Sequence, residues 1–441
     1  MPSKAGPAAE AVPLDPPSLF RRLANRRGLV LAASGGPDST ALMLLMARWQ
    51  DRPPVHVAIV DHGLRAEAAA EARMAADNAE RLGLSWRILQ APESYAGGNL
   101  QDWARRVRYR CLIAAAHEAG YDAIVTAHHL DDQAETFLLR LARGSGVYGL
   151  AAMPEESIAD GVALVRPLIK APRAALLEIA RESGLPVASD PSNLDPRFDR
   201  VRLRSLMPEL AAHGLNAERL AETAGRLGRA AAALDHYTTS FLQEHFEVDA
   251  FGIIAGLCEA FAEVPEEVGL RALALILKAV GGADYTPRLQ GVEAVYQAIR
   301  AAGPSTDLRR TLHGVVVGMK RGRLTARREW GRRGLAAVAA PPGATLVWDS
   351  RFRVEVPRLS GELGVGPLGR SNRRLRSPNA DQGTLRALPG LYQDGTLVAV
   401  PERIFAADRG ASLDSLAVKC VVGQGLGLGA APEPSAARSP F

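Results

Sequence analysis

Cysteine is scarce in this chain, with three residues among 441 and no C-x-x-C pair. Cys111, Cys258 and Cys420 lie far apart, which argues against a zinc site, an iron–sulfur cluster or a disulfide framework. Gly-Lys pairs are also missing, so the Walker A phosphate loop is excluded. No apolar run approaches the ~20 residues of a membrane helix, and the first residues lack the apolar core of a signal peptide. We therefore expect a cytoplasmic protein without a membrane span.

The length of 441 residues predicts two or three domains, because a single hydrophobic core rarely grows that large. Changes in composition place the boundaries. We expect an α/β domain over residues 19–205, a helical domain over 206–305, and a small, partly β, mixed α/β domain over 306–422. The tails, residues 1–18 and 423–441, are rich in Pro, Ala and Gly, and we expect them to be disordered.

Short apolar runs alternate with helix-like stretches through the first of these domains. The apolar runs cover residues 28–33, 55–60, 86–89 and 122–126, and the helix-like stretches cover 41–50, 67–83 and 101–119. This alternation is typical of a doubly wound parallel sheet, which binds ligands at the carboxyl ends of its strands. Polar segments follow three of those ends, at residues 34–36, 61–63 and 126–129. The sequence therefore predicts a site at this edge of the sheet.

The segment SGGPDST, Ser34 to Thr40, lies between the first apolar run and a helix-like stretch. A glycine turn between a strand and a helix start binds phosphate, because unpaired N–H groups and the positive helix end face the turn. The glycines permit close approach of the backbone, and the hydroxyls are further potential donors. Asp38 would repel a phosphate unless a cation lay between them, so we expect Mg²⁺ carried with a nucleotide. The alternative is an ordinary turn with a helix cap.

The segment TAHHLDDQAET, Thr126 to Thr136, leaves the fourth apolar run and enters a helix. Helical spacing brings His128, an aspartate at 131 or 132, and Glu135 together near the helix start. The cluster could bind zinc or iron, although such sites usually recruit further His or Cys ligands. It could also be an acidic helix cap, which the helix dipole favours. Its place on the same sheet edge as the phosphate loop favours a third interpretation, that it completes an ATP–Mg²⁺ site.

Arginine is concentrated in three short segments, 105–110, 197–204 and 320–333, in a chain of formal net charge +5. Guanidinium groups bind phosphate bidentately, so such clusters suit a nucleic-acid backbone. For each cluster taken alone, a solvated charged face is the alternative. Aromatic residues make up only 5% of the chain. We therefore expect arginine and backbone contacts, rather than extended base stacking, to dominate any binding of RNA.

Several motifs carry a family resemblance. SGGPDS at Ser34 to Ser39 resembles the PP-loop of the N-type ATP pyrophosphatases, which split ATP to AMP and pyrophosphate. Within that superfamily the tRNA(Ile)-lysidine synthases show motifs similar to DHGLR at 61–65, A-R-x-x-R-Y at 104–109, HHLDDQAET at 128–136, RGSG at 143–146 and DPSN at 190–193. The family pattern F-x-R-N-x-[IL]-R is matched at Phe198 to Arg204, except that Val201 replaces the asparagine. The basic positions are kept, and only an amide contact is in question.

The resemblance implies a PP-loop catalytic domain over residues 19–205 and a two-step ligation. ATP adenylates the 2-carbonyl oxygen of the wobble cytidine in tRNA(Ile) with a CAU anticodon, and pyrophosphate is released. The ε-amine of free L-lysine then displaces AMP and forms lysidine. The expected partners are thus this tRNA and L-lysine, the cofactors are ATP and Mg²⁺, and a homodimer is left open.

The resemblance also implies roles for individual residues. The ATP-binding residues are Ser34, Gly35, Gly36, Pro37, Asp38, Ser39, Asp61 and His62, and the Mg²⁺ ligands are Asp38 and Asp132. The catalytic residues are Asp38, Asp132, His128, Arg105 and Arg108. Asp131 and Glu135 are expected to bind lysine, and Arg200, Arg204, Arg327 and Arg328 to bind tRNA.

Three rival functions are weighed against this one. A tRNA thiolase of the same superfamily would commonly need paired cysteines for a cluster or a persulfide relay. An amidating synthetase would ordinarily need a glutaminase domain with a nucleophilic cysteine. Neither is visible in the sequence. A non-catalytic RNA or nucleotide binder would not need Asp38 together with the carboxylates of HHLDD.

Overall fold

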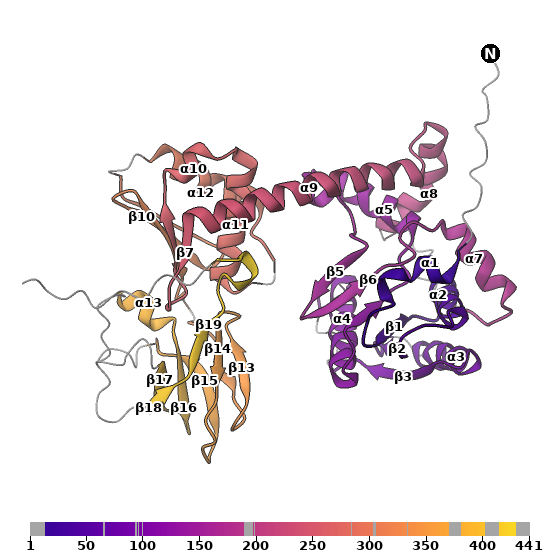
Figure 1. Ribbon diagram of the computed structural model, residues 1–441, viewed down its shortest axis with the longest axis horizontal. Coiled ribbons are helices and arrows are strands. Elements are labelled where there is room, and N and C mark those ends of the chain that lie inside the picture. Colours follow the sequence, from indigo (N-terminus) through magenta and orange to yellow (C-terminus); the bar gives the residue numbers. More distant parts are fainter. Residues whose placement is uncertain are drawn as a thin grey trace, which may run out of the picture. The chain divides into compact units, whose positions relative to one another are not determined.

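The computed structural model describes residues 14–64, 67–92, 95, 97–98, 100–188, 197, 199–283, 285–302, 306–332, 334–369, 381–401 and 414–428. The chain divides into two compact units, residues 1–231 and 232–441. The long helix α9 (Ala217–His245) contains the boundary between them (Figure 1). Along the described parts of the chain, none of the helices combines the length and the apolar character that crossing a membrane requires.

The first unit contains a six-stranded sheet. Its strands are β1 (Leu29–Ala33), β2 (Val55–Asp61), β3 (Ser85–Gln90), β4 (Ala123–Val125), β5 (Glu156–Ala159) and β6 (Val162–Val165). They lie in the order β3-β2-β1-β4-β6-β5, and every pair is parallel except β5 with β6. The exception has a local cause, because Asp160 and Gly161 both have positive φ and form a two-residue hairpin turn. The expected parallel sheet is therefore present with one antiparallel edge strand.

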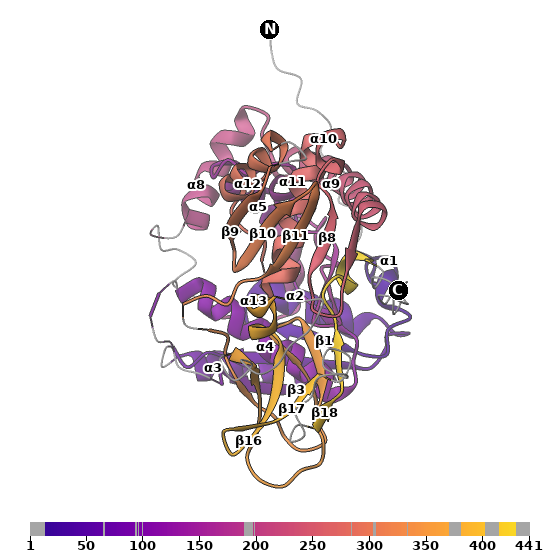
Figure 2. The same cartoon turned by 90° about the vertical axis from the view of Figure 1, so that its left-hand side faces the viewer.

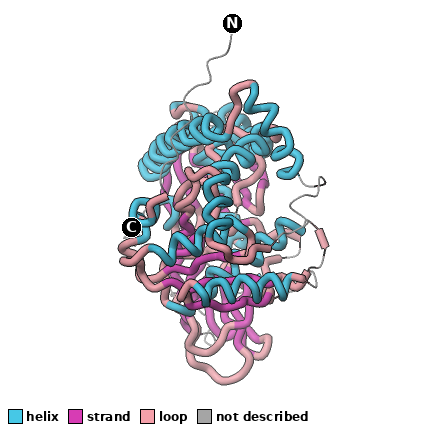
Figure 3. The backbone as a smooth tube through the Cα atoms, turned by 90° about the vertical axis from the view of Figure 1, so that its right-hand side faces the viewer, coloured by secondary structure: helices cyan, strands magenta, loops and turns pink. Residues whose placement is uncertain are grey.

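Helices cover both faces of this sheet. The helices of this unit that precede α9 are α1 (Pro16–Leu19), α2 (Pro37–Arg48), α3 (Ala68–Arg81), α4 (Leu100–Ala119), α5 (Leu130–Leu141), α6 (Val147–Leu150), α7 (Arg173–Glu182) and α8 (Asp199–Ala212), with the 3-10 turn η1 (Arg21–Leu23). Leu29 and Leu31 of β1 point into a core shared with α2, α3 and α7, whereas Val30 points toward α4. A strand that is buried on both faces is apolar throughout, which is why it is visible in the sequence. Figure 3 shows helices on either side of the strands of this unit.

A five-stranded antiparallel sheet opens the second unit. Its strands are β7 (Phe246–Val248), β8 (Ile254–Leu257), β9 (Leu308–Leu312), β10 (Val315–Lys320) and β11 (Arg323–Arg328), in the order β7-β8-β11-β10-β9. Helices α10 (Ala260–Glu263), α11 (Glu266–Gly281) and α12 (Leu289–Ala301) share one hydrophobic core with this sheet (Figure 2). The apolar faces of these amphipathic helices pack against the sheet. The helices and the strands therefore form one core, and the domain boundary expected at residue 305 would divide it.

Two smaller sheets complete the second unit. One contains β12 (Val338–Ala339), β15 (Leu363–Pro367), β16 (Pro389–Gln393), β17 (Thr396–Pro401) and β18 (Asp414–Leu416), and the other contains β13 (Thr345–Trp348), β14 (Phe352–Glu355) and β19 (Val418–Cys420). Their strands pair antiparallel, apart from β17 with β18. The helical elements here are α13 (Gln382–Arg386) and η4 (Gln424–Leu426). The β-rich C-terminal region expected from the sequence is thus present.

Parts of both expected disordered tails are ordered. Helix α1 begins at Pro16, inside the first 18 residues, and Leu14 packs against the core of the first unit. Near the other end of the chain, Leu426 and Leu428 are buried in the core of the five-stranded sheet. Apolar side chains spaced among Pro, Gly and Ala residues were enough to anchor these segments. The rest of each tail lies outside the described residues.

Asp349, in the turn between β13 and β14, joins the sheets of the second unit. Its carboxylate accepts hydrogen bonds from Arg328 Nε at 3.0 Å and Arg328 Nη2 at 3.1 Å, and from Arg351 Nε at 2.7 Å. Arg351 is 1% exposed and also donates to the carbonyl of Ala387 at 2.6 Å. Gly282 is the residue that follows α11. It lies so close to the turn of Asp349 that a Cβ on Gly282 would clash with the Asp349 carbonyl. One carboxylate, 14% exposed, is therefore the shared hydrogen-bond acceptor of two guanidinium groups.

Replacing Asp349 by Asn should lower the free energy of unfolding by about 3–5 kcal/mol, because it leaves a fully buried guanidinium without its counter-charge. Urea unfolding followed by tryptophan fluorescence measures the change, since Trp348 lies beside the turn. Asp414→Asn, at an exposed position of the same unit, is the matched control and should change stability by less than ~0.5 kcal/mol. Equal stability of the two variants would contradict the assignment.

Candidate active site

The phosphate loop connects β1 to α2, with Gly35 at φ 79°. Ser39 Oγ donates to the carbonyl of Gly36 at 2.9 Å and accepts from the Ser34 backbone N–H at 3.2 Å, and Thr40 Oγ1 donates to the same carbonyl at 3.1 Å. Both hydroxyls are therefore used within the loop, and not as the additional phosphate donors that the sequence suggested. No side chain caps the start of α2, so the first N–H groups of this helix remain available to an anion.

Helix α5 brings a second group of polar residues to the same edge of the sheet. His129 caps this helix, because its Nδ1 accepts from the Asp132 N–H at 3.3 Å while the Asp132 carboxylate accepts from the His129 N–H at 3.1 Å. His129 Nε2 lies 3.7 Å from Asp38 Oδ2 and 3.4 Å from Asp132 Oδ2. The two carboxylates predicted to meet therefore do so around one imidazole. His129, rather than the expected His128, lies between these carboxylates. Its place as the cap residue just before LDDQ is the feature of the sequence that indicates it.

The charges around Asp38 favour its ionised form. Burial works against ionisation, but His129, Arg173 and Arg204 outweigh it and lower the pKa of Asp38. Burial likewise opposes a charge on His129, yet the carboxylates of Asp38, Asp132 and Asp131 raise the pKa of this imidazole. The side chains of His129, Arg173 and Arg204 thus favour the carboxylate form of Asp38.

Asp38 and Asp132 are suitable ligands for Mg²⁺ that arrives with a nucleotide. Asp38 Oδ1 is shielded from solvent and has no hydrogen-bond partner, so a cation there would satisfy it. Within the described residues, no group of three or more His, Cys, Asp or Glu side chains is placed to hold a metal ion. Asp38 and Asp132 suit Mg²⁺, which is commonly bound by one or two carboxylates together with substrate phosphates.

His128 points to a different environment from His129. Its Nδ1 lies 2.8 Å from Thr126 Oγ1. Burial lowers the pKa of His128 to about 4, and Arg166, Arg105 and Arg200 add to the effect against an opposing contribution from Asp132. The imidazole is therefore neutral at pH 7 and cannot serve as a strong base. Arg105 lies over the ring of Tyr109, with 5.1 Å from its Cζ to the ring centroid.

The two carboxylates predicted to bind lysine differ in their surroundings. Glu135 is 2% exposed; its Oε1 accepts from Arg204 Nε at 2.8 Å, while its Oε2 is buried without a hydrogen-bond partner. Asp131 is partly exposed, and its Oδ2 accepts from the Arg173 backbone N–H at 2.9 Å. Arg204, predicted to bind tRNA, is thus the partner of Glu135. Arg200 is exposed in the first turn of α8.

The carboxyl end of β2 contributes Asp61 and His62. Asp61 Oδ1 accepts from the Gly63 N–H at 2.9 Å and so shapes the turn. His62 packs near Trp103, with ring centroids 5.9 Å apart, and among the described residues neither of its ring nitrogens has a hydrogen-bond partner. Burial and Arg108 lower the pKa of His62, against a contribution from Asp61. A neutral imidazole with two unused nitrogens could bind a polar ligand at this edge.

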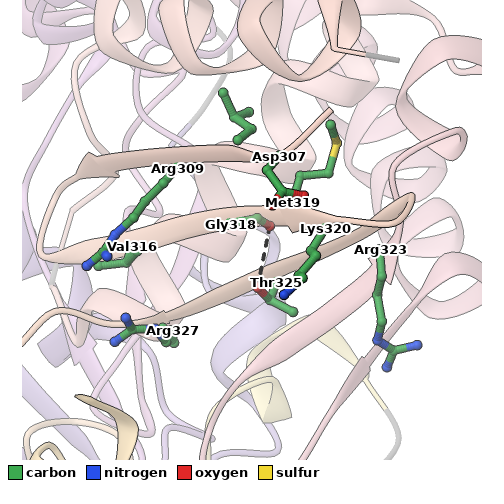
Figure 4. A pocket seen from close by; sticks show the side chains of 10 residues that line it. Asp307, Arg309, Val316, Gly318, Met319, Lys320, Arg323, Thr325 and Arg327 are labelled. Carbon is green, nitrogen blue, oxygen red and sulfur yellow. Dashed lines mark hydrogen bonds between the residues drawn. The ribbon is translucent and has the colours of Figure 1, made fainter. Parts of the chain in front are cut away.

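The second unit has a basic hollow of about 400 Å³ on the face of its five-stranded sheet. Gly318 lies at its centre, where a Cβ would approach Thr325 Oγ1 to 3.2 Å. Figure 4 shows Arg309, Lys320 and Arg327 around this glycine. Arg327 lies 3.8 Å from Asp381, whereas within the described residues neither Arg309 nor Lys320 forms an ion pair. Arg328, also expected to bind tRNA, donates hydrogen bonds to Asp349.

Comparison with known proteins places this geometry in a family. A family model described as PP-loop domain matches residues 16–210. The tRNA(Ile)-lysidine synthase of Ruegeria pomeroyi is 38% identical over 382 residues, which cover 85% of this chain and 88% of the relative. That of Bradyrhizobium diazoefficiens is 42% identical over 72% of this chain and 95% of its own length, and that of Methylobacterium nodulans is 44% identical over 73% and 98%.

The matched PP-loop region contains the phosphate loop, the His129 cap and the carboxylates around it, and the similarity to whole relatives extends well into the second unit. A PP-loop domain implies ATP as the nucleotide. Taken together, the site and the extent of the similarity show that this chain belongs to the tRNA(Ile)-lysidine synthase family.

Proposed function

We propose that this protein ligates L-lysine to the wobble cytidine of tRNA(Ile) with a CAU anticodon, using ATP and forming lysidine, AMP and pyrophosphate. The meeting of Asp38 and Asp132 around His129, beside a phosphate loop, is the observation that carries the proposal. It supplies what adenylation requires, namely a place for an anionic triphosphate and carboxylates for its cation. Similarity to named lysidine synthases supports the choice of substrates.

In the first step, the bond between the cytidine 2-oxygen and the α-phosphorus forms while the bond to the β-phosphate breaks, and pyrophosphate leaves with the electron pair. The backbone of Ser34 to Ser39 and the start of α2 bind the phosphates, and Asp61 and His62 lie beside adenosine. Mg²⁺ held by Asp38 and Asp132 would neutralise phosphate charge. The protein's main contribution is therefore positioning and electrostatic stabilisation.

In the second step, the ε-nitrogen of lysine bonds to C2 of the base, and AMP leaves with its oxygen. Only the neutral amine attacks, so the ammonium must first lose a proton. Glu135 is the better placed of the two candidate carboxylates, because its Oε2 is a buried acceptor without a partner. Asp131 is already fixed by the N–H of Arg173. We assign the lysine ammonium to Glu135, with Asp131 at the rim of the site.

His128 contributes as a neutral hydrogen-bonding group beside the reacting base, since its pKa of about 4 leaves it uncharged during catalysis. Arg105, Arg108 and Arg200 bind RNA phosphates next to that base. Arg309, Lys320 and Arg327 in the hollow of the second unit bind further RNA phosphates, because Arg309 and Lys320 form no ion pair within the described residues. Arginine in both units thus serves the same polyanion.

Replacing Asp38 by Asn should reduce pyrophosphate release by about 10²-fold or more, since charge neutralisation at the phosphates is lost. Pyrophosphate release in the presence of tRNA and lysine is the measurement. tRNA binding should stay within about twofold, and Asp51→Asn, at an exposed turn, serves as the control. Unfolding of the Asp38 variant would instead show that the carboxylate is needed for structure.

Replacing Glu135 by Gln should raise the KM for lysine about 10–100-fold while adenylation continues, because a hydrogen bond between charged groups is lost. Lysine-dependent release of AMP gives the KM, and lysine-independent pyrophosphate release reports adenylation. The exposed Glu178→Gln is the control. A normal KM for lysine, or equal loss of both steps, would contradict this role.

Replacing Arg309 and Lys320 by Gln should weaken tRNA binding about 3–10-fold and reduce the slope of log K against log salt by about 2, one unit for each lost phosphate contact. Titrations at several salt concentrations provide both values. The control removes two exposed cations from the same unit, Arg353→Gln with Lys419→Gln. If both double variants behave alike, the hollow is an ordinary solvated surface.

A further inference from the structure

Arg173, the first residue of α7, lies at the centre of the candidate site although the sequence analysis did not single it out. The chain is fastened on either side of it. The Ala171 carbonyl accepts from the Leu130 N–H at 3.0 Å, and the Arg173 N–H donates to Asp131 Oδ2 at 2.9 Å. The start of α7 is therefore held against the start of α5, independently of the Arg173 side chain.

The Arg173 guanidinium faces Asp38 across a gap. Its Nε lies 3.7 Å from Asp38 Oδ1, beyond hydrogen-bonding distance. Both of these atoms are shielded from solvent and have no hydrogen-bond partner. A buried donor and a buried acceptor that are left unsatisfied opposite each other are unusual. The remainder of each side chain is accessible, since the Arg173 and Asp38 side chains are 29% and 28% exposed, so a ligand can approach this pair.

The other cations near Asp38 are already engaged. Arg204 donates to Glu135 at 2.8 Å, and His129 belongs to the cap of α5. In the described part of the chain, the Arg173 side chain forms no hydrogen bond. It is therefore the cation that remains available beside the phosphate loop.

We propose that Arg173 binds the β- and γ-phosphates of ATP and neutralises the pyrophosphate that leaves in the adenylation step. This role rests on the proposed function. When the bond between the α-phosphorus and the bridging oxygen breaks, the electron pair stays on pyrophosphate, and Arg173 donates hydrogen bonds to its oxygens. Asp38 then faces the cation that accompanies the nucleotide. Both buried atoms thereby gain the partners that they lack in the structure.

Binding measurements on the full chain test this role without turnover. Arg173→Gln should weaken binding of α,β-methylene-ATP and of pyrophosphate about 10-fold or more, while AMP binding changes less than twofold, because AMP lacks the phosphates that Arg173 contacts. Arg173→Lys should recover part of the loss. The control is Arg181→Gln, at an exposed position near the other end of α7. Unchanged binding of both phosphate ligands by Arg173→Gln would overturn the proposal.

A double-variant experiment separates direct contact from an effect through Asp38. In an Asp38→Asn background, Arg173→Gln should still weaken binding of α,β-methylene-ATP if Arg173 touches phosphate. If Arg173 acts only as the counter-ion of Asp38, the second change should have no further effect, and the proposal fails. Mass analysis of nucleosides formed by the unchanged protein tests the proposed function separately. Absence of lysidine there would overturn the reaction but not the phosphate contact.

Discussion

Three helix N-termini converge at the carboxyl edge of the first sheet, and the charges that meet there must balance. Asp38 lies in the first turn of α2, Asp131 and Asp132 in that of α5, and Arg173 begins α7. The positive helix ends stabilise the carboxylates, while His129 and Arg173 hold them at distances of 3.4–3.7 Å. A nucleotide that arrives with its cation adds charges of both signs, so its phosphates can face Arg173 and the helix N-termini while its cation faces the carboxylates.

The second unit uses its charges for two separate purposes. Arg351 is buried, and Asp349 and Arg328 are largely shielded from solvent; together they hold the sheets together, whereas Arg309 and Lys320 face a hollow and form no ion pair among the described residues. Arg327 and Arg328 are neighbours in the sequence, but their side chains lie in different environments because alternate residues of a strand point to opposite faces. A basic run in the sequence therefore does not define a binding surface by itself.

The sequence predicted the parts of the fold that depend on local pattern. β1 to β4 and the edge where polar segments gather were correctly placed, because buried parallel strands are apolar runs followed by turns. The antiparallel strand β5 was not expected, although it follows from the local turn at Asp160 and Gly161. The core that α11 and α12 share with the five-stranded sheet was not expected either, because it depends on contacts between distant segments. The same limit applies to the site. Asp38 and the HHLDD segment were found, but Arg173 reaches Asp38 only through the packing of α7.

The internal hydrogen bonds of the phosphate loop have a thermodynamic consequence. Ser39 and Thr40 tie the loop to the Gly36 carbonyl, and the Ala188 N–H donates to the Gly35 carbonyl at 2.8 Å. The loop is thus preorganised, and a triphosphate need not order the backbone when it binds. Little conformational entropy is lost at that step, so binding energy from the phosphates remains available to align the α-phosphorus with the base that attacks it.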